Sequence, residues 1–125
     1  SGTKIHMFER QAEQAEKQVK TKEARIDELT EMIDSLRKQQ VEQEKNHLRQ
    51  IDALKKAKDE GNDDKSTSLQ IKLNGKEAEL ERMENLLMEM HKKMDTVKEE
   101  QVTAEMECKE ATRSQLRMEK DLEVV

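Results

Sequence analysis

The sequence predicts an all-α protein: an antiparallel coiled coil, folded as a long helical hairpin that can dimerise further. Three observations predict this fold class. Apolar residues recur at alternating spacings of three and four, the composition cannot fill a globular core, and one break signal lies near the centre of the chain. A homodimer of one near-continuous helix, either antiparallel or parallel, is the alternative arrangement.

The composition excludes several classes of protein. Of the 125 residues, 42% are charged and 32% hydrophobic, with one aromatic residue and no proline. Such a chain has too little apolar volume for a globular core, so each helix must bury its apolar stripe against another helix. Acidic and basic residues are mixed, and no basic block is present to follow a nucleic acid backbone. The longest apolar run, residues 86–88, is too short to cross a membrane.

Residues 4–58 are predicted to form the first helix, preceded by a Ser-Gly-Thr segment (1–3) that resembles a cloning remnant. We call the heptad positions that face the partner helix the seam, and most of them are apolar. In this helix the seam contains Ile5, Phe8, Ala12, Ala15, Val19, Ile26, Leu29, Ile33 and Leu36. Beyond Leu36 the alternating spacing of three and four residues reaches glutamines and a histidine. The nearby hydrophobic residues Val41, Leu48 and Ile51 lie one residue away from these positions. We therefore expect a weak, slipped section at 39–46.

Residues 59–68 are predicted to be a turn or helix break, because no apolar residue occurs between 58 and 68. Gly61 and Asn62 are the residue types that most readily adopt the left-handed conformation at a helix end. The candidate caps of the next helix are Asp63, Asp64 and Ser66. We expect the chain to reverse here, and the alternative is a helix that continues through this segment.

Residues 69–125 are predicted to form the second helix, with a seam that starts at Leu69 and Leu73 and ends at Val125. Its other apolar members are Leu80, Met83, Leu87, Met90, Met94, Val97, Ala104, Cys108, Ala111, Met118 and Leu122. Near its start, Asn74 and Gly75 lie between alternating hydrophobic residues, which is also typical of a β-hairpin. We favour a glycine-weakened helix, because Leu69 and Leu73 already follow the heptad count.

The charges beside the seam favour antiparallel helices. A parallel, in-register dimer would bring together three like-charge pairs from the second helix and no attractive pair. In an antiparallel pair, the numbers of two facing residues have a constant sum, and one alignment has the sum 123. In this alignment Ala12 faces Ala111 and Lys22 faces Gln101. The midpoint of the pairing then falls between Gly61 and Asn62. Four flanking pairs are then attractive and one, Glu16–Glu105, is repulsive. The attractive pairs are Glu23–Lys98, Arg37–Glu84, Lys4–Asp121 and Arg25–Glu100.

Some hydrophobic residues lie off the seam. They are Met32, Leu86, Met88, Val102, Met106 and Leu116. One interpretation is that they are scattered surface residues, which are common in proteins. The other is that they form a face on which a second hairpin or a partner helix docks, since methionine adapts to such surfaces.

No catalytic, cofactor or metal site is predicted, and we expect the protein not to be an enzyme. The acidic residues of 59–68 lack the spacing of an EF-hand loop. Met90 and Met94 belong to the seam, so a copper site with Met88 and His91 is not expected. Cys108 is also a seam position, and a single cysteine provides no disulfide and fits a reducing compartment.

The heptad pattern resembles that of the broad class of long cytoskeletal, centrosomal, motor-stalk and membrane-tethering coiled coils. We therefore expect a structural scaffold segment of a larger cytoplasmic protein, including a cytoskeletal or centrosomal location. It would position flanking domains or drive oligomerisation. The alternative function is an adaptor that binds a partner's amphipathic helix through a Met-rich face. The expected partners are a second copy or another coiled-coil protein, without nucleic acid, membrane insertion or a small-molecule substrate.

Overall fold

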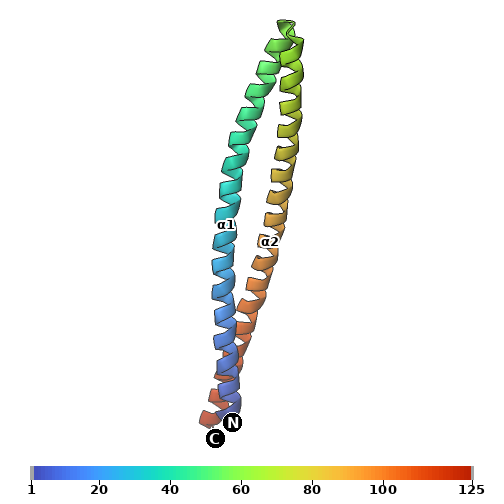
Figure 1. Ribbon diagram of the computed structural model, residues 1–125. Coiled ribbons are helices and arrows are strands. Elements are labelled where there is room, and N and C mark those ends of the chain that lie inside the picture. The colour runs from blue at the N-terminus through green and yellow to red at the C-terminus, as the bar shows by residue number, and fades with distance from the viewer. Residues whose placement is uncertain (1, 125) are drawn as a thin grey trace. The chain divides into compact units, whose positions relative to one another are not determined.

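The computed structural model describes residues 2–124 and contains two helices. Helix α1 spans Gly2–Asp59 and helix α2 spans Asp63–Val124. The helices pack against each other as an all-α helical hairpin, which confirms the predicted fold class (Figure 1). The alternative prediction of one near-continuous helix is therefore wrong, because the chain reverses between Asp59 and Asp63. The predicted seam residue Val125 lies outside the described residues.

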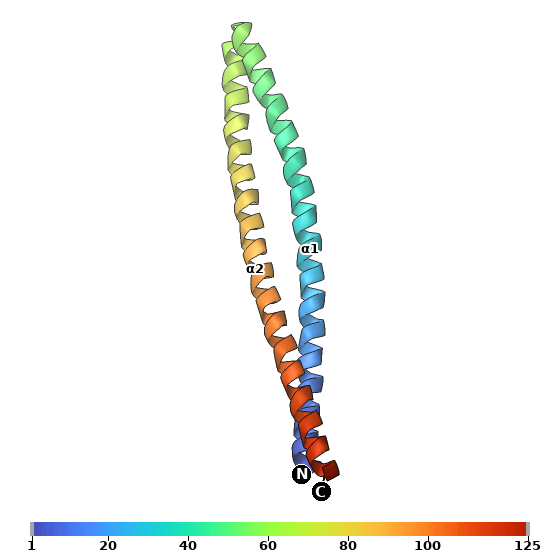
Figure 2. The same ribbon diagram turned by 180° about the vertical axis from the view of Figure 1, so that it is seen from behind.

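The chain divides into two compact units. The described residues of unit 1 are 2–30 of α1 and 93–124 of α2, and unit 2 is Glu31–Lys92 with the turn. In unit 1 two helical segments distant in sequence lie side by side, and in unit 2 the segments are joined by the reversal (Figures 1 and 2). None of the described helices is long and apolar enough to span a bilayer.

The reversal in unit 2 begins with a glycine that ends α1. Gly61 has a φ of 70°, in the left-handed region that glycine adopts without a Cβ clash. Its N–H donates to the Lys58 carbonyl at 3.1 Å, and the Asn62 N–H donates to the Ala57 carbonyl at 3.0 Å. These two bonds define the Schellman motif, so carbonyls at the end of α1 are satisfied by the turn itself.

The same turn starts α2 through Asn62. The Asn62 side-chain Oδ1 accepts a hydrogen bond from the Lys65 N–H at 3.2 Å, and its carbonyl accepts from the Ser66 N–H at 3.0 Å. Asn62 is therefore the N-cap of α2, and the predicted caps Asp63, Asp64 and Ser66 are wrong. Asp63 and Asp64 instead occupy the first turn, where carboxylates stabilise the positive end of the helix.

The break is shorter than the predicted range of 59–68. Residues 63–68 belong to α2, because a capped N-terminus allows this polar segment to be helical without apolar packing. Asn74 and Gly75 are also inside α2, which confirms the weakened helix over the β-hairpin. Ile71 is exposed and Leu73 is buried. The Gln70 amide donates to Asn74 Oδ1 at 3.0 Å, a contact between residues one helical turn apart.

The two glycines of unit 2 are expected to respond oppositely to the same substitution. Gly61→Ala should lower the free energy of unfolding by about 1 kcal/mol, because alanine disfavours a positive φ. Gly75→Ala should raise it by about 0.5–1 kcal/mol, because alanine favours the helix interior. A Cβ at either position would meet nothing within 4 Å, so backbone conformation alone decides both signs. Urea unfolding followed by circular dichroism measures both, and two changes of the same sign would contradict this account.

The seam of α1 does not slip in the polar section. Val41 and Leu48 are 50% and 61% exposed, whereas the positions that continue the original count are half-buried. These positions are Gln40, Gln43, His47 and Gln50. Leu54 and Ala57, which resume the same count, are buried. The predicted slip at 39–46 is therefore wrong. If the heptad phase changed at 39–46, it would have to change back within two helical turns for Leu54 and Ala57 to be buried.

Candidate interaction surfaces

The fully buried part of the seam in unit 1 consists of three alanines and one leucine. Leu29 is buried, and so are Ala15, Ala104 and Ala111. The remaining predicted members are half-buried, except one. The half-buried members are Ile5, Phe8, Ala12, Val19, Ile26, Met94, Val97, Cys108 and Met118.

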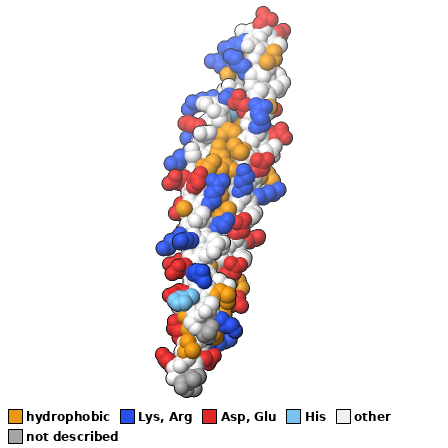
Figure 3. All heavy atoms as spheres, turned by 60° about the horizontal axis from the view of Figure 1, so that its bottom comes forward, with side chains coloured by type: hydrophobic (Ala, Val, Ile, Leu, Met, Phe, Trp, Pro, Cys, Tyr) orange, Lys and Arg blue, Asp and Glu red, His pale blue; other side chains and the backbone are white. Residues whose placement is uncertain are grey.

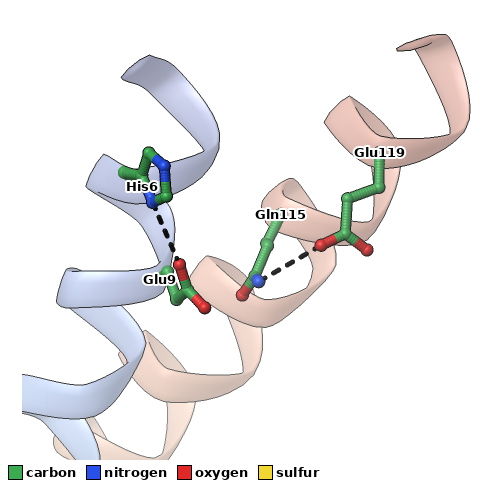
Figure 4. Close-up of polar contacts among 4 residues, drawn as sticks. All are labelled: His6, Glu9, Gln115 and Glu119. Carbon is green, nitrogen blue, oxygen red and sulfur yellow. Dashed lines mark hydrogen bonds and ion pairs between the residues drawn. The ribbon is translucent and has the colours of Figure 1, made fainter. Parts of the chain in front are cut away.

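Leu122 is the predicted seam residue that does not pack, since it is 50% exposed. Figure 4 shows two polar contacts at this end of unit 1, each within one helix. His6 Nδ1 lies 3.3 Å from a Glu9 carboxylate oxygen, and the Gln115 amide donates to Glu119 at 3.3 Å.

Three contacts in unit 1 report how the two helices are aligned. Cys108 Sγ lies 3.7 Å from the Ala12 carbonyl oxygen, and Thr30 Oγ1 lies 3.5 Å from Met94 Sδ. Lys22 Nζ forms an ion pair with Glu100. The residue numbers of these pairs add to 120, 124 and 122. They support the predicted pairing near 123 and not the pairings one heptad away, at 116 or 130.

The charged partners beside the seam differ from those predicted. Glu100 pairs with the seam residue Lys22, while Arg25 pairs with Glu28 on its own helix at 3.1 Å. In unit 2 the Arg37 guanidinium donates to His91 Nε2 at 3.0 Å instead of contacting Glu84. Among the described residues no ion pair joins Glu23 to Lys98 or Lys4 to Asp121. Exposed pairs are worth only about 0.2–1 kcal/mol, so long side chains readily choose another neighbour.

The seam of unit 2 is apolar at both ends and polar in the middle. Its buried residues are Ile33, Leu54, Ala57, Leu73, Leu87 and Met90. Leu36, Leu80 and Met83 are half-buried. In the polar middle, Lys76 Nζ donates to Gln43 Oε1 at 2.7 Å and lies 3.2 Å from Glu79. The sequence did not predict this bond between the helices, although both residues continue the heptad pattern.

The polar section is only partly satisfied. His47 Nε2 lies 4.0 Å from a Glu77 carboxylate oxygen, too far for a hydrogen bond. His47 Nδ1 and Gln50 Oε1 are buried and have no hydrogen-bond partner among the described residues. Buried polar atoms without partners reduce stability, so this section is the weakest part of the seam in unit 2.

The hydrophobic residues predicted as a partner surface do not share one face. Met32, Leu86, Met88, Val102, Met106 and Leu116 are all exposed. With seam positions lettered a and d, Met32 and Leu86 are at g, beside the seam of unit 2. The other residues are at b and f, on the side of α2 opposite its seam. Figure 3 shows hydrophobic side chains reaching the surface between charged ones on one face of the molecule.

The groove beside Leu86 is a surface feature of unit 2. It is lined by Met83 and Leu86 with Gln39, Gln43, Glu79 and Arg82 around them. Among residues 2–124, no group of three or more His, Cys, Asp and Glu side chains is placed to hold a metal ion. Comparisons with protein-family models, curated proteins and solved structures gave no match to this chain. A function for it therefore has to be inferred from the seams and the exposed faces of α2.

Proposed function

We propose that this chain is a structural module: a coiled-coil hairpin that belongs to a larger cytoplasmic protein and holds the segments before and after it close together. One observation carries the proposal. The Schellman turn at Gly61 and Asn62 reverses the chain, and unit 1 then pairs the start of α1 with the end of α2. Figures 1 and 2 both place the N and C labels at the same end of unit 1.

The chemistry of the seam supports a mechanical role. Buried seam residues such as Leu29 resist separation of the helices, and the contacts of Thr30 with Met94 and of Cys108 with Ala12 agree with one alignment of the two helices. Charged residues cover the outer surfaces, so the module stays solvated while its ends are held together. The proposal assigns no catalysis, cofactor or small-molecule substrate to the chain. The predicted adaptor function stays a prediction, and the division of its residues between two faces favours the structural role.

Energy transfer between fluorophores at the two ends tests the proposal. In a Cys108→Ala background, labels at Thr3→Cys and Glu123→Cys should show high transfer at low concentration, because the hairpin brings these exposed positions together. A tenfold excess of unlabelled chain should leave the transfer unchanged. A matched control with labels at Thr3→Cys and Glu28→Cys, about 40 Å apart along the part of α1 in unit 1, should show lower transfer.

Two results would contradict the proposal. Low transfer at all concentrations would mean that the ends are apart. Transfer that disappears with excess unlabelled chain would mean that the ends meet between two molecules and not within one.

A further inference from the structure

The outer face of α2 in unit 1 carries an ordered series of side chains. Reading positions b and f from 95 to 113, the residues are acidic, then apolar, then basic. They are Asp95, Glu99, Val102, Met106, Lys109 and Arg113. All of them are exposed, with Val102 at 54% and Met106 at 65%. Their spacings alternate between four and three, as in the seam, so this face can pack against another helix in the same way.

The charges of this face form one acidic and one basic pair along the helix. Asp95 and Glu99 are four residues apart, as are Lys109 and Arg113, and like charges at this spacing repel. Among the described residues, none of these four side chains takes part in an ion pair. Other charged residues of unit 1, such as Lys22 and Glu100, do pair. The face therefore presents two like-charged clusters on either side of an apolar pair.

We propose that a second copy of this chain docks on this face, antiparallel, about a two-fold axis at the level of Ala104. Facing residue numbers then add to 208, so Val102 of each copy meets Met106 of the other. The same alignment places Glu99 opposite Lys109 and Asp95 opposite Arg113. The two-fold axis makes every pair occur twice, so the interface is self-complementary.

Other alignments lose this match. A parallel arrangement in register brings each like-charged cluster against its own copy. Sliding the antiparallel pair by one heptad places Asp95 opposite Met106, or Arg113 opposite Val102. The proposed alignment contains one unfavourable contact, since Glu105 of each copy lies beside the axis near its counterpart. The complementary charges outnumber it, and they select this alignment over the others.

The dimer should be weak and sensitive to salt. Its centre holds two apolar side chains from each copy, and its charges stay at the edge of a narrow contact. Raising the ionic strength from about 0.05 M to about 0.5 M should weaken it, because the ion pairs are screened. This inference rests on the proposed structural function and deepens it by naming a second hairpin as the partner.

Charge exchange tests the inference by sedimentation equilibrium. The natural chain should dimerise with rising concentration. The variant Asp95→Lys with Glu99→Lys, and the variant Lys109→Glu with Arg113→Glu, should each be monomeric at concentrations where the natural chain is dimeric. An equal mixture of the two variants should form a heterodimer, because one face is then wholly basic and the other wholly acidic. A chain with all four substitutions should again form a homodimer.

Apolar substitutions provide a matched control. Val102→Lys with Met106→Lys should weaken the dimer by about tenfold or more, because the centre of the contact is lost. Val41→Lys with Leu48→Lys, at exposed b positions of α1 in unit 2, should leave it unchanged. Glu105→Gln should tighten the dimer by removing the repulsion at the axis.

A natural chain that is monomeric throughout, or a mixture of charge variants that stays monomeric, would overturn the inference. The inference would also be overturned if the Val41 and Leu48 control weakened the dimer as much as the substitution of Val102 and Met106. The energy-transfer measurement tests formation of the hairpin independently of dimerisation. If transfer is high in a chain that does not dimerise, the second copy is wrong and the proposed function stands; if transfer is low, the proposed function itself is wrong.

Discussion

Leu29→Ala is expected to lower the free energy of unfolding by about 3 kcal/mol. Leu29 is 1% exposed and is the largest fully buried side chain of the described residues. Its removal deletes apolar contacts and leaves a cavity, because the neighbouring layers keep the two helices at their spacing. A domain of this size is stable by only about 5–15 kcal/mol, so the loss is a large share of the total.

The measurement is urea unfolding followed by circular dichroism, with the midpoint expected to fall markedly. Met32→Ala is the matched control, since Met32 lies three residues away on α1 and is 44% exposed. It should change the free energy of unfolding by no more than about 0.5 kcal/mol. Equal losses in the two variants would show that Leu29 is not part of a packed seam.

His47→Leu combined with Gln50→Leu is expected to raise the free energy of unfolding by about 2 kcal/mol. Both residues occupy seam positions of unit 2, and His47 Nδ1 and Gln50 Oε1 are buried without partners. Leucine removes these polar atoms and adds apolar contact against α2. Glu77, which lies 4.0 Å from His47, is 60% exposed and remains solvated when the histidine is lost.

The control is Asn46→Leu, an exposed position of the same section, which should leave stability within about 0.5 kcal/mol. Chemical unfolding compares the two variants directly. A loss of stability on replacing His47 and Gln50 would mean that their polar groups are satisfied in solution, and it would contradict the interpretation of this section as weak.

Much of the fold could be predicted from the sequence because heptad spacing is a direct consequence of helix geometry. Leu29, Ile33 and Ala104 were expected in the seam, and each is buried. The hairpin was predicted from Gly61, whose positive φ few other residues adopt without strain. These features depend on local backbone conformation and on periodicity, which are both written along a single helix.

Side-chain partners could not be predicted in the same way. Lys22 contacts Glu100, and Arg37 contacts His91, because long side chains select among several neighbours of nearly equal energy. Asn62 as the cap was also missed, since three nearby residues have side chains of the same capability.

The sequence by itself determined that this protein forms coiled-coil helices, and it favoured an antiparallel arrangement with a reversal at Gly61, because heptad spacing and a glycine act locally. Only the tertiary structure decided that the seam stays in phase through Gln43 and His47. It also decided that the outer hydrophobic residues stay exposed. The physical reason is that burial of Leu54 and Ala57 against α2 imposes one phase on the whole helix, outweighing the local preference of Val41 and Leu48 for burial.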